Sequence, residues 1–392
     1  MLRTHRFRWL IALGAAAAAT SAPVVAAADA APPSHVVSNY ETASGNTLQR
    51  DCGFSHKLPS NSGLSIWLFC DTPIATSSGK VIGFIPGSTA AVGPFTAGKV
   101  PTGLSEVPTP PAALETLPSN QGPEQFLPTP KGLVLPDGTT ACGSSGSNSY
   151  AATWMSGVTR EPSSDNSSLL LISFTDVCVG GGGTITTERF GLAEYDPASN
   201  TVKSMTRVFH SATAGTSLSP QLLLGSPIFS GGNLYLFSST CDSSGFGACS
   251  SGRVFLARTP GQPASWKVSS SYQFWDPSAS GGWTSSPTSA QSVISGATPL
   301  AVTADSYTSV GQGLDLIEET SLGGDDRVWT ASSPTGPWSQ KTTGKVPCTS
   351  GSGTLNFCRA LIGHPELSTS SQLLLSFYNP GDDHVWVTAM SW

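Results

Sequence analysis

The chain has 392 residues, of which only 11% are charged while 38% are hydrophobic. So few charges exclude a long helical bundle or coiled coil, whose exposed faces need Glu, Lys and Arg. A formal net charge of −6 is not basic enough to grip nucleic acid and is too small for a disordered polymer. The 42 Gly and 30 Pro, with abundant Ser and Thr, are typical of many short strands joined by turns.

Residues 1–30 are typical of a secretory signal peptide. Arginines precede an apolar run from Trp9 to about Ala19, and small residues at Ala28 and Ala30 suit signal peptidase. We expect cleavage near Ala30, with a cut before Ala28 as the alternative. No later run is long enough to cross a bilayer, so we expect a secreted, extracellular protein without a membrane span.

Cysteine usage fits an extracellular protein. Eight cysteines lie in the expected mature chain: Cys52, Cys70, Cys142, Cys178, Cys241, Cys249, Cys348 and Cys358. Export favours four disulfides, and pairing of sequence neighbours is the simplest of about 105 possible connectivities. A metal site is the alternative, but no CxxC or clustered Cys/His spacing supports one. We expect neither a metal nor a cofactor.

One loose unit recurs along the chain: a strand of aliphatic and aromatic residues, a polar or acidic cluster, a Gly/Ser-rich turn and a second strand. Its five copies begin at Ser65, Leu169, Asn233, Gly313 and Gln372. Most copies have another short apolar strand just upstream, and no helical period is present. The pattern predicts an all-β fold, a five-bladed β-propeller. A β-sandwich or two stacked β domains are the alternatives.

Two stretches depart from the repeat. The last copy ends at Trp392 with only its inner strands, so we expect residues 36–50 to supply the outer strand that closes the ring. Residues 86–140 are rich in proline, which blocks ladder hydrogen bonds, and we expect a long excursion between the first and second blades. An inter-domain linker is the alternative, but a similar hairpin precedes the stretch, which favours a single domain over 31–392.

The hairpin at residues 50–72 predicts a pair of carboxylates. Its turn centres on Asn61, so opposed residues should have numbers that sum to 122. Cys52 and Cys70 meet this condition, which predicts a cross-strand disulfide that fixes the register. Asp51 and Asp71 meet it as well, on the other face of the ribbon, with Cβ atoms about 5 Å apart.

Two facing like charges are destabilising, so the fold must separate them or use them. Paired carboxylates in different environments can supply an acid of raised pKa and an ionised base or nucleophile, as glycoside cleavage requires. The alternative is that Asp51 and Asp71 only cap turns. Residues at corresponding positions of the other repeat copies should lie at the same end of the propeller as Asp51 and Asp71. We expect four of them to be secondary substrate contacts: Asp176, Glu318, Arg359 and His364. For His364 a structural role is the alternative.

The stretches RDCGFSHKL and LSIWLFCDT resemble the RDGGxS and LWxFGDT pair of a secreted propeller family, long catalogued as a domain of unknown function, that includes endo-D-arabinanases. GHPELS with LLLSFYNP resembles its closing blade. The resemblance implies that Asp51 and Asp71 are the catalytic carboxylates and that D-arabinan of cell walls is a candidate substrate. Cys52 and Cys70 replace glycines of the family pattern, which indicates a divergent actinobacterial subgroup.

These observations favour a secreted glycoside hydrolase that acts on cell-wall or extracellular polysaccharide. A non-catalytic carbohydrate-binding or scaffold propeller is the alternative. A protease or esterase finds little support, because the chain has no GxSxG or HExxH motif. We expect a monomer whose partner is a polysaccharide or oligosaccharide, with no nucleic acid.

Overall fold

The computed structural model describes residues 33–59, 63–107, 121–162, 169–242, 247–307, 313–351 and 357–392. Within these ranges the chain is mostly β, with two short α-helices, α1 (Asn39–Ser44) and α2 (Pro263–Trp266). Brief 3-10 turns interrupt the loops at η2 (Gly181–Gly183), η3 (Pro220–Leu222), η4 (Ser269–Ser271), η5 (Ser280–Gly282) and η6 (Pro287–Ser289). The mostly β content agrees with the sequence. The expected signal peptide lies outside the described residues.

Three antiparallel sheets follow one another through the middle of the chain. The first contains β10 (Tyr150–Arg160), β11 (Leu170–Val179), β12 (Ile185–Asp196) and β13 (Thr201–His210). The second contains β14 (Gly225–Ser230), β15 (Asn233–Cys241), β16 (Gly252–Pro260), β17 (Gln273–Trp275) and β18 (Trp283–Thr284). The third contains β19 (Ala301–Tyr307), β20 (Gly313–Glu319), β21 (Asp325–Ala331) and β22 (Ser339–Lys345). In each sheet the central pair is a strand-turn-strand unit of the predicted repeat.

The C-terminal sheet includes a strand from the other end of the chain. It contains β23 (Arg359–Gly363), β24 (Gln372–Asn379), β25 (His384–Ser391) and β1 (Ser34–His35), in the order β1-β25-β24-β23. The outer strand is therefore residues 34–35, opposite Val387 and Trp386, and not residues 36–50 as expected. Residues 37–48 form β2 (Val37–Ser38), α1 and β3 (Asn46–Leu48) instead.

A local cap explains why residues 36–50 do not continue as one strand. The hydroxyl of Ser38 accepts the N–H of Glu41, and the Glu41 carboxylate accepts the N–H of Ser38. This reciprocal pair satisfies two of the donors that a helix start leaves unpaired. Gly45, at φ 71°, ends the helix in a left-handed conformation. The helix therefore turns the chain away from β25.

The N-terminal sheet is built differently from the other four. Its order is β2-β9-β8-β5-β4, with β4 (Cys52–Lys57), β5 (Leu64–Phe69), β8 (Thr89–Pro94) and β9 (Thr102–Glu106). The hairpin of β6 (Thr72–Thr76) and β7 (Val81–Ile85) does not pair with β5 as the repeat predicted. It forms a separate three-stranded sheet with β3.

Burial explains the choice of partner for β5. The β8 residues Thr89 to Gly93 are small and buried, whereas Val81 and Ile82 of β7 are more than half exposed. The strand beside β5 also pairs with β9, and this central position requires a segment whose residues are buried, which is β8. Residues 89–106, expected within the proline-rich excursion at 86–140, therefore complete the N-terminal sheet.

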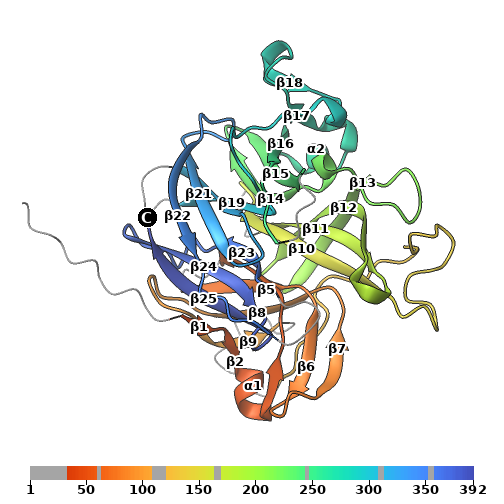
Figure 1. Ribbon diagram of the computed structural model, residues 1–392, viewed down its shortest axis with the longest axis vertical. Coiled ribbons are helices and arrows are strands. Elements are labelled where there is room, and N and C mark those ends of the chain that lie inside the picture. Colours follow the sequence, from red (N-terminus) through yellow and green to blue (C-terminus); the bar gives the residue numbers. More distant parts are fainter. Residues whose placement is uncertain are drawn as a thin grey trace, which may run out of the picture.

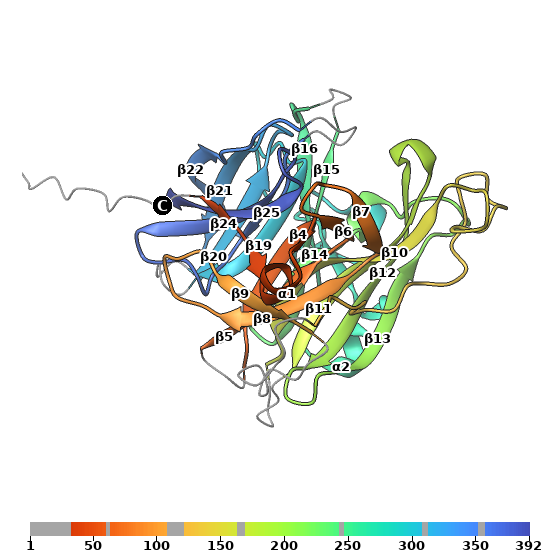
Figure 2. The ribbon, with the colours of Figure 1, turned by 90° about the horizontal axis from the view of Figure 1, so that it is seen from below.

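One edge strand of each of the five larger sheets, called its first strand below, contacts the next in a ring, in the order β4, β10, β14, β19, β23 and back to β4. In Figure 1 the labels β10, β14, β19 and β23 gather near the middle, while β13, β18 and β22 lie toward the periphery. Figure 2 views the molecule from the side that carries β6, β7 and α1.

Hydrophobic clusters fill the spaces between neighbouring sheets. Ile66 and Leu68 of β5 pack with Ile172 of β11, and Trp67 of β5 packs with Leu374 of β24. Each of these side chains is at most 1% exposed. Burying one such side chain contributes about 1.5–3 kcal/mol to folding. The N-terminal sheet is therefore held from both sides, by the β10–β13 sheet and by the C-terminal sheet.

Four disulfides join the eight cysteines in sequence order, as expected: Cys52–Cys70, Cys142–Cys178, Cys241–Cys249 and Cys348–Cys358. Their Cα atoms are 5.4 to 6.1 Å apart. In the described part of the chain, no helix has the length and apolar character to cross a membrane.

Candidate active site

A pocket of about 570 Å³ lies where three sheets meet the β6–β7 hairpin. Its volume is within the range of sites for small ligands, about 300–1,000 Å³. The lining residues come from the N-terminal sheet, the β6–β7 hairpin, the β10–β13 sheet, the C-terminal sheet and their loops, and among the described residues none comes from β14 to β22. They are Gln49, Asp51, Cys52, Cys70, Asp71, Pro73, Phe84, Tyr150, Trp154, Met155, Thr175, Val179, Gly183, Ile185, Phe357, Arg359, Ala360, Tyr378 and Asp383.

A bulge in β4 changes the expected opposition of the two aspartates. The pairs Ser55↔Trp67 and His56↔Ile66 follow the predicted register, but Cys52 is opposite Phe69, and the register shifts by one residue at Gly53. Gly53 has φ 115°, a conformation that L side chains rarely adopt. The carbonyl of Asp51 therefore accepts the N–H of Cys70, and Asp51 does not lie directly opposite Asp71.

Asp51 is held by an arginine from the C-terminal sheet. Its Oδ2 accepts Nε of Arg359 at 2.8 Å and lies 2.8 Å from Nη2, while its Oδ1 accepts the N–H of Cys52 at 2.7 Å. The guanidinium carbon of Arg359 lies 3.7 Å from the ring centroid of Tyr378. This charge-assisted contact orients the Asp51 carboxylate and compensates its charge. About a quarter of each side chain stays exposed, so both remain accessible.

Asp71 has no arginine partner and is held by three hydrogen bonds. Its Oδ1 accepts the N–H of Gly87 at 2.7 Å and Nε1 of Trp154 at 3.0 Å, and its Oδ2 accepts the hydroxyl of Tyr150 at 2.5 Å. Gly87 has φ 95°, and a Cβ there would lie 2.8 Å from the backbone nitrogen of Thr153. Only glycine therefore allows this backbone to reach the carboxylate.

The environment of Asp71 shifts its pKa upward. Burial raises the pKa of Asp71 above the ordinary aspartate value, the charge of Asp51 acts in the same direction, and the three hydrogen bonds oppose both. Because two N–H donors occupy Oδ1, the proton of the neutral form resides on Oδ2, beside Tyr150. Burial and the charge of Asp71 raise the pKa of Tyr150 too, so the phenol keeps its proton and can donate to or accept from Oδ2.

Asp176 and Glu318, expected as substrate contacts, do not line the pocket. Neighbouring residues of a strand face opposite sides, and Thr175 faces the pocket while Asp176 faces the sheet interior. Asp176 is fully buried, is ion-paired with Arg207, and lies 3.9 Å from Nη1 of Arg189. Glu318 is likewise fully buried, where it accepts Nε1 of Trp329 at 2.5 Å and lies 3.6 Å from Arg327.

His364 and Arg359 were expected at the same end of the fold, and the structure corrects this. The whole of β23 separates them, a span of about 16 Å for five residues. His364 is fully buried, stacks on Trp67 with ring centroids 4.6 Å apart, and has Nδ1 2.6 Å from the hydroxyl of Ser55. Burial lowers the pKa of His364 to about 3, so this imidazole is a neutral packing group.

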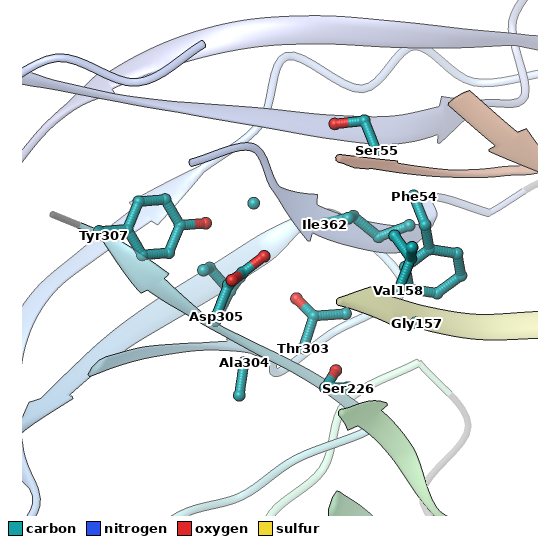
Figure 3. Close-up of a pocket in the computed structure, with 12 residues that line it drawn as sticks. Phe54, Ser55, Gly157, Val158, Ser226, Thr303, Ala304, Asp305, Tyr307 and Ile362 are labelled. Atoms are coloured by element: carbon teal, nitrogen blue, oxygen red, sulfur yellow. The ribbon is translucent and has the colours of Figure 1, made fainter. Parts of the chain in front are cut away.

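A second cavity lies among the first strands of the five sheets. Figure 3 shows Asp305 and Tyr307 of β19 together with Ser55 of β4 and Ile362 of β23 around it. Its volume of about 20 Å³ is enough for roughly one water and far too small for a sugar ring. The larger pocket at Asp51 and Asp71 is therefore the candidate active site.

Sequence reasoning did not find several residues of the site. Tyr150 and Gly87 hold Asp71, yet neither belongs to a strand-end acidic cluster. Glu319, adjacent to the expected Glu318, does not line the pocket; it is 3% exposed, and burial raises its pKa to about 8 against the lowering effect of the Leu361 and Ala360 N–H groups. Strand alternation shows that only one of two adjacent glutamates can face a given side, but the sequence does not say which.

Comparison with known proteins places the chain in a family. The family model described as "Domain of unknown function (DUF5005)" matches residues 157–388, more than half of the chain. The chain belongs to this family. No curated protein matches it.

Solved structures resemble the chain only weakly. Zg3597, a family 117 glycoside hydrolase from Zobellia galactanivorans, is 9% identical over 91% of this chain and 89% of its own, with a TM-score of 0.44. A GH43_1 enzyme from Xanthomonas citri is 8% identical over 90% and 92%, also at 0.44. An alpha-L-arabinofuranosidase from Lactobacillus brevis is 11% identical over 88% and 91%, at 0.38. At these values the likeness decides neither the fold nor the function of this chain.

Proposed function

We propose that this family member is a secreted glycoside hydrolase that acts on cell-wall or extracellular polysaccharide. The observation that carries the proposal is the difference between two carboxyl groups of one pocket. Asp51 is paired with the Arg359 guanidinium, whereas Asp71 is partly buried without a cation and has a raised pKa. An ionised carboxylate beside a protonated carboxyl is the combination that glycosidic bond cleavage requires.

The two environments assign the two roles. Asp71 donates its Oδ2 proton to the glycosidic oxygen as the bond to the anomeric carbon breaks, so the leaving sugar departs as a neutral alcohol. Asp51 either removes a proton from the attacking water or attacks the anomeric carbon itself. Arg359 positions Asp51 from one side, and the Gly87 N–H and Trp154 indole keep Oδ1 of Asp71 as an acceptor, so Oδ2 carries the proton that is transferred.

The proposed architecture is a five-bladed β-propeller in a single domain. Two findings support it: the five larger sheets contact one another in a ring through their first strands, and β1 adds the outer strand to the C-terminal sheet. In such a propeller, first strands surround the axis and ligands bind at one end of the ring. The four disulfides support an extracellular location for the protein, which we propose to be monomeric.

D-arabinan is the proposed first substrate to test. The sequence resemblance of the β4 and β5 stretches to a family with endo-D-arabinanases supports it, together with Asp51 and Asp71 lining one pocket.

The test uses the protein secreted on expression of the full chain. It is incubated with D-arabinan-containing cell-wall glycans and, in parallel, with unrelated polysaccharides, and released oligosaccharides are separated by chromatography. We expect release by the native protein and a loss of about 10²–10⁴-fold in Asp51→Asn and in Asp71→Asn. Asp242→Asn is the matched control, because Asp242 is an exposed aspartate paired with Arg253 outside the pocket.

Two outcomes would contradict the proposal. Activity that survives both Asp51→Asn and Asp71→Asn would exclude the assigned site. No release from any glycan would exclude the enzyme, and glycan binding that persists in both variants would then favour a non-catalytic carbohydrate-binding protein.

A further inference from the structure

Exposed hydrophobic side chains gather beside the candidate active site. In the described part of the chain, the large hydrophobic residues that are most exposed are Val81, Ile82, Phe84, Ile185 and Val268, at 44–54%. Three of these lie on β7. Phe84 and Ile185 also line the pocket. Single exposed hydrophobic residues are ordinary on a protein surface, but a group of them at a pocket marks a binding surface.

The β6–β7 hairpin presents one apolar face to the pocket. Pro73 of β6 is paired with Phe84 of β7, and both line the pocket. Ile82, 54% exposed, lies two residues before Phe84 on the same strand, where β7 bulges against β6. We name Pro73, Ile82, Phe84 and Ile185 the apolar shelf.

The pocket lining combines charged and apolar side chains. Asp51, Arg359 and Asp383 line it from the N-terminal and C-terminal sheets, whereas Pro73, Phe84, Val179 and Ile185 line it from the hairpin and the β10–β13 sheet. Polyhydroxyl sugars match the charged residues, where carboxylates and a guanidinium can satisfy their hydroxyls. The four apolar side chains offer no donor or acceptor, and the hydroxyl of Tyr150, against which Phe84 packs, donates to Asp71, so a sugar hydroxyl placed on the apolar side chains loses water without a partner.

We propose that the apolar shelf binds an alkyl or acyl chain carried by the substrate, so that the natural substrate is a lipid-substituted glycan. This inference rests on the proposed function, since it places the sugar portion at Asp51 and Asp71. The shelf suits a chain better than a sugar ring because Ile82 and Ile185 have no flat face for stacking. Its aromatic member, Phe84, already packs edge-to-face on Tyr150 with centroids 5.1 Å apart.

A second copy of the chain is the competing occupant. β7 is the last strand in its sheet, with the order β3-β6-β7, so its outer edge could pair with another strand. The shelf itself is continuous with the pocket through Phe84 and Ile185, which favours a ligand that occupies both.

The test measures binding of alkyl glycosides of increasing chain length, from methyl to nonyl, below their micelle concentrations. Both anomers of the arabinofuranosides are used, with alkyl glucosides as a second head group. Calorimetry on Asp71→Asn avoids turnover during the titration. We expect Kd to fall about two- to fourfold for each added methylene, the lower value for partly exposed burial.

The variant Ile82→Ser/Ile185→Ser removes two aliphatic side chains from the shelf. We expect it to abolish the chain-length dependence, while Val268→Ser, a substitution at an equally exposed site outside the pocket, retains it. All three sites are exposed, so the variants should fold, which circular dichroism checks. A dependence that is flat in the parent protein, or unchanged in the double variant, would overturn the inference.

Two further measurements separate the possible failures. Sedimentation that shows a dimer abolished by Ile82→Ser would assign the shelf to a second copy and overturn the inference. Glycan hydrolysis without chain-length dependence refutes the shelf but not the enzyme. Chain-length dependence without hydrolysis of any glycan refutes the enzyme but supports the shelf as a lipid-binding surface.

Discussion

The acidic side chains of the pocket, Asp51 and Asp71, and those inside the sheets, Asp176 and Glu318, differ in what surrounds them. Asp176 and Glu318 are fully buried and lie against arginines of their own sheets. Asp51 also has an arginine but is about a quarter exposed, and Asp71 has hydrogen-bond donors without a cation.

The difference distinguishes carboxylates that only stabilise the fold from carboxyl groups that can take part in catalysis. A fully buried carboxylate beside a guanidinium touches no solvent, so it cannot exchange protons with a ligand. A carboxyl group that lines a pocket and has a raised pKa can do so. Four variants test whether this distinction holds.

The largest expected effect is that of Asp71→Asn. We expect kcat on a cleaved glycan to fall about 10²–10⁴-fold, because the amide has no acidic proton to donate. The free energy of unfolding near pH 7 should stay the same or rise, since burial already disfavours the charged form of Asp71. Kinetics and urea unfolding on the same preparation check both. A large loss of stability would mean that Asp71, like Asp176, mainly stabilises the fold.

Removal of the Cys52–Cys70 disulfide should affect both stability and activity. Its residues are 18 apart in sequence, and the chain-entropy model gives a loss of about 3 kcal/mol for Cys52→Ser/Cys70→Ser. Both cysteines are adjacent to a pocket aspartate, so kcat should fall as well. The matched control is Cys241→Ser/Cys249→Ser, which opens a separation of 8 residues with a loss of about 2.5 kcal/mol. Equal loss of kcat in the two double variants would contradict a role of the Cys52–Cys70 disulfide in positioning the pocket aspartates.

Asp176→Ala should destabilise the protein without changing its chemistry. Removing one partner of a buried ion pair costs about 3–5 kcal/mol, and the 20–25% exposure of Arg189 and Arg207 reduces this to about 2–3 kcal/mol. Urea unfolding measures the loss, and kcat per folded molecule should be unchanged. A fall in kcat without loss of stability would show that Asp176 acts in the active site.

The smallest expected effect is a pH shift in Tyr150→Phe. If Asp71 is the acid, activity falls as pH rises through its pKa, because the proton is then lost. The hydroxyl of Tyr150 lowers that pKa by stabilising the charged form. Its removal should move the alkaline limb of the kcat/KM profile to higher pH. A shift to lower pH would contradict the assignment of Asp71 as the acid.

Much of the β content could be read from the sequence because long apolar strands alternate with Gly/Ser-rich turns. The hairpins β11–β12, β15–β16, β20–β21 and β24–β25 all lie where the repeat predicted them. The pairing of β5 could not be read, because β7 and β8 are both good strands in isolation. Only the space beside β5, which admits small side chains, selects β8.

The site was predicted in part for a similar reason. Turn symmetry brought Asp51 and Asp71 together, but it had no means to detect the Gly53 bulge, which depends on a left-handed backbone. The strand-end rule also placed Arg359 and His364 at the same end of the fold. It failed because Arg359 begins β23 and His364 follows the last residue of that strand.

The pairing of β1 with β25 joins residues 34–35 to residues 386–387. Such a contact spans nearly the whole chain, and contacts of long sequence separation form slowly because loop closure costs entropy. During synthesis the C-terminal sheet cannot be completed until the last strand has emerged. The N-terminal strand β1 therefore has no partner in this sheet until β25 has been made, and a premature stop codon that removes β25 would leave β1 unpaired.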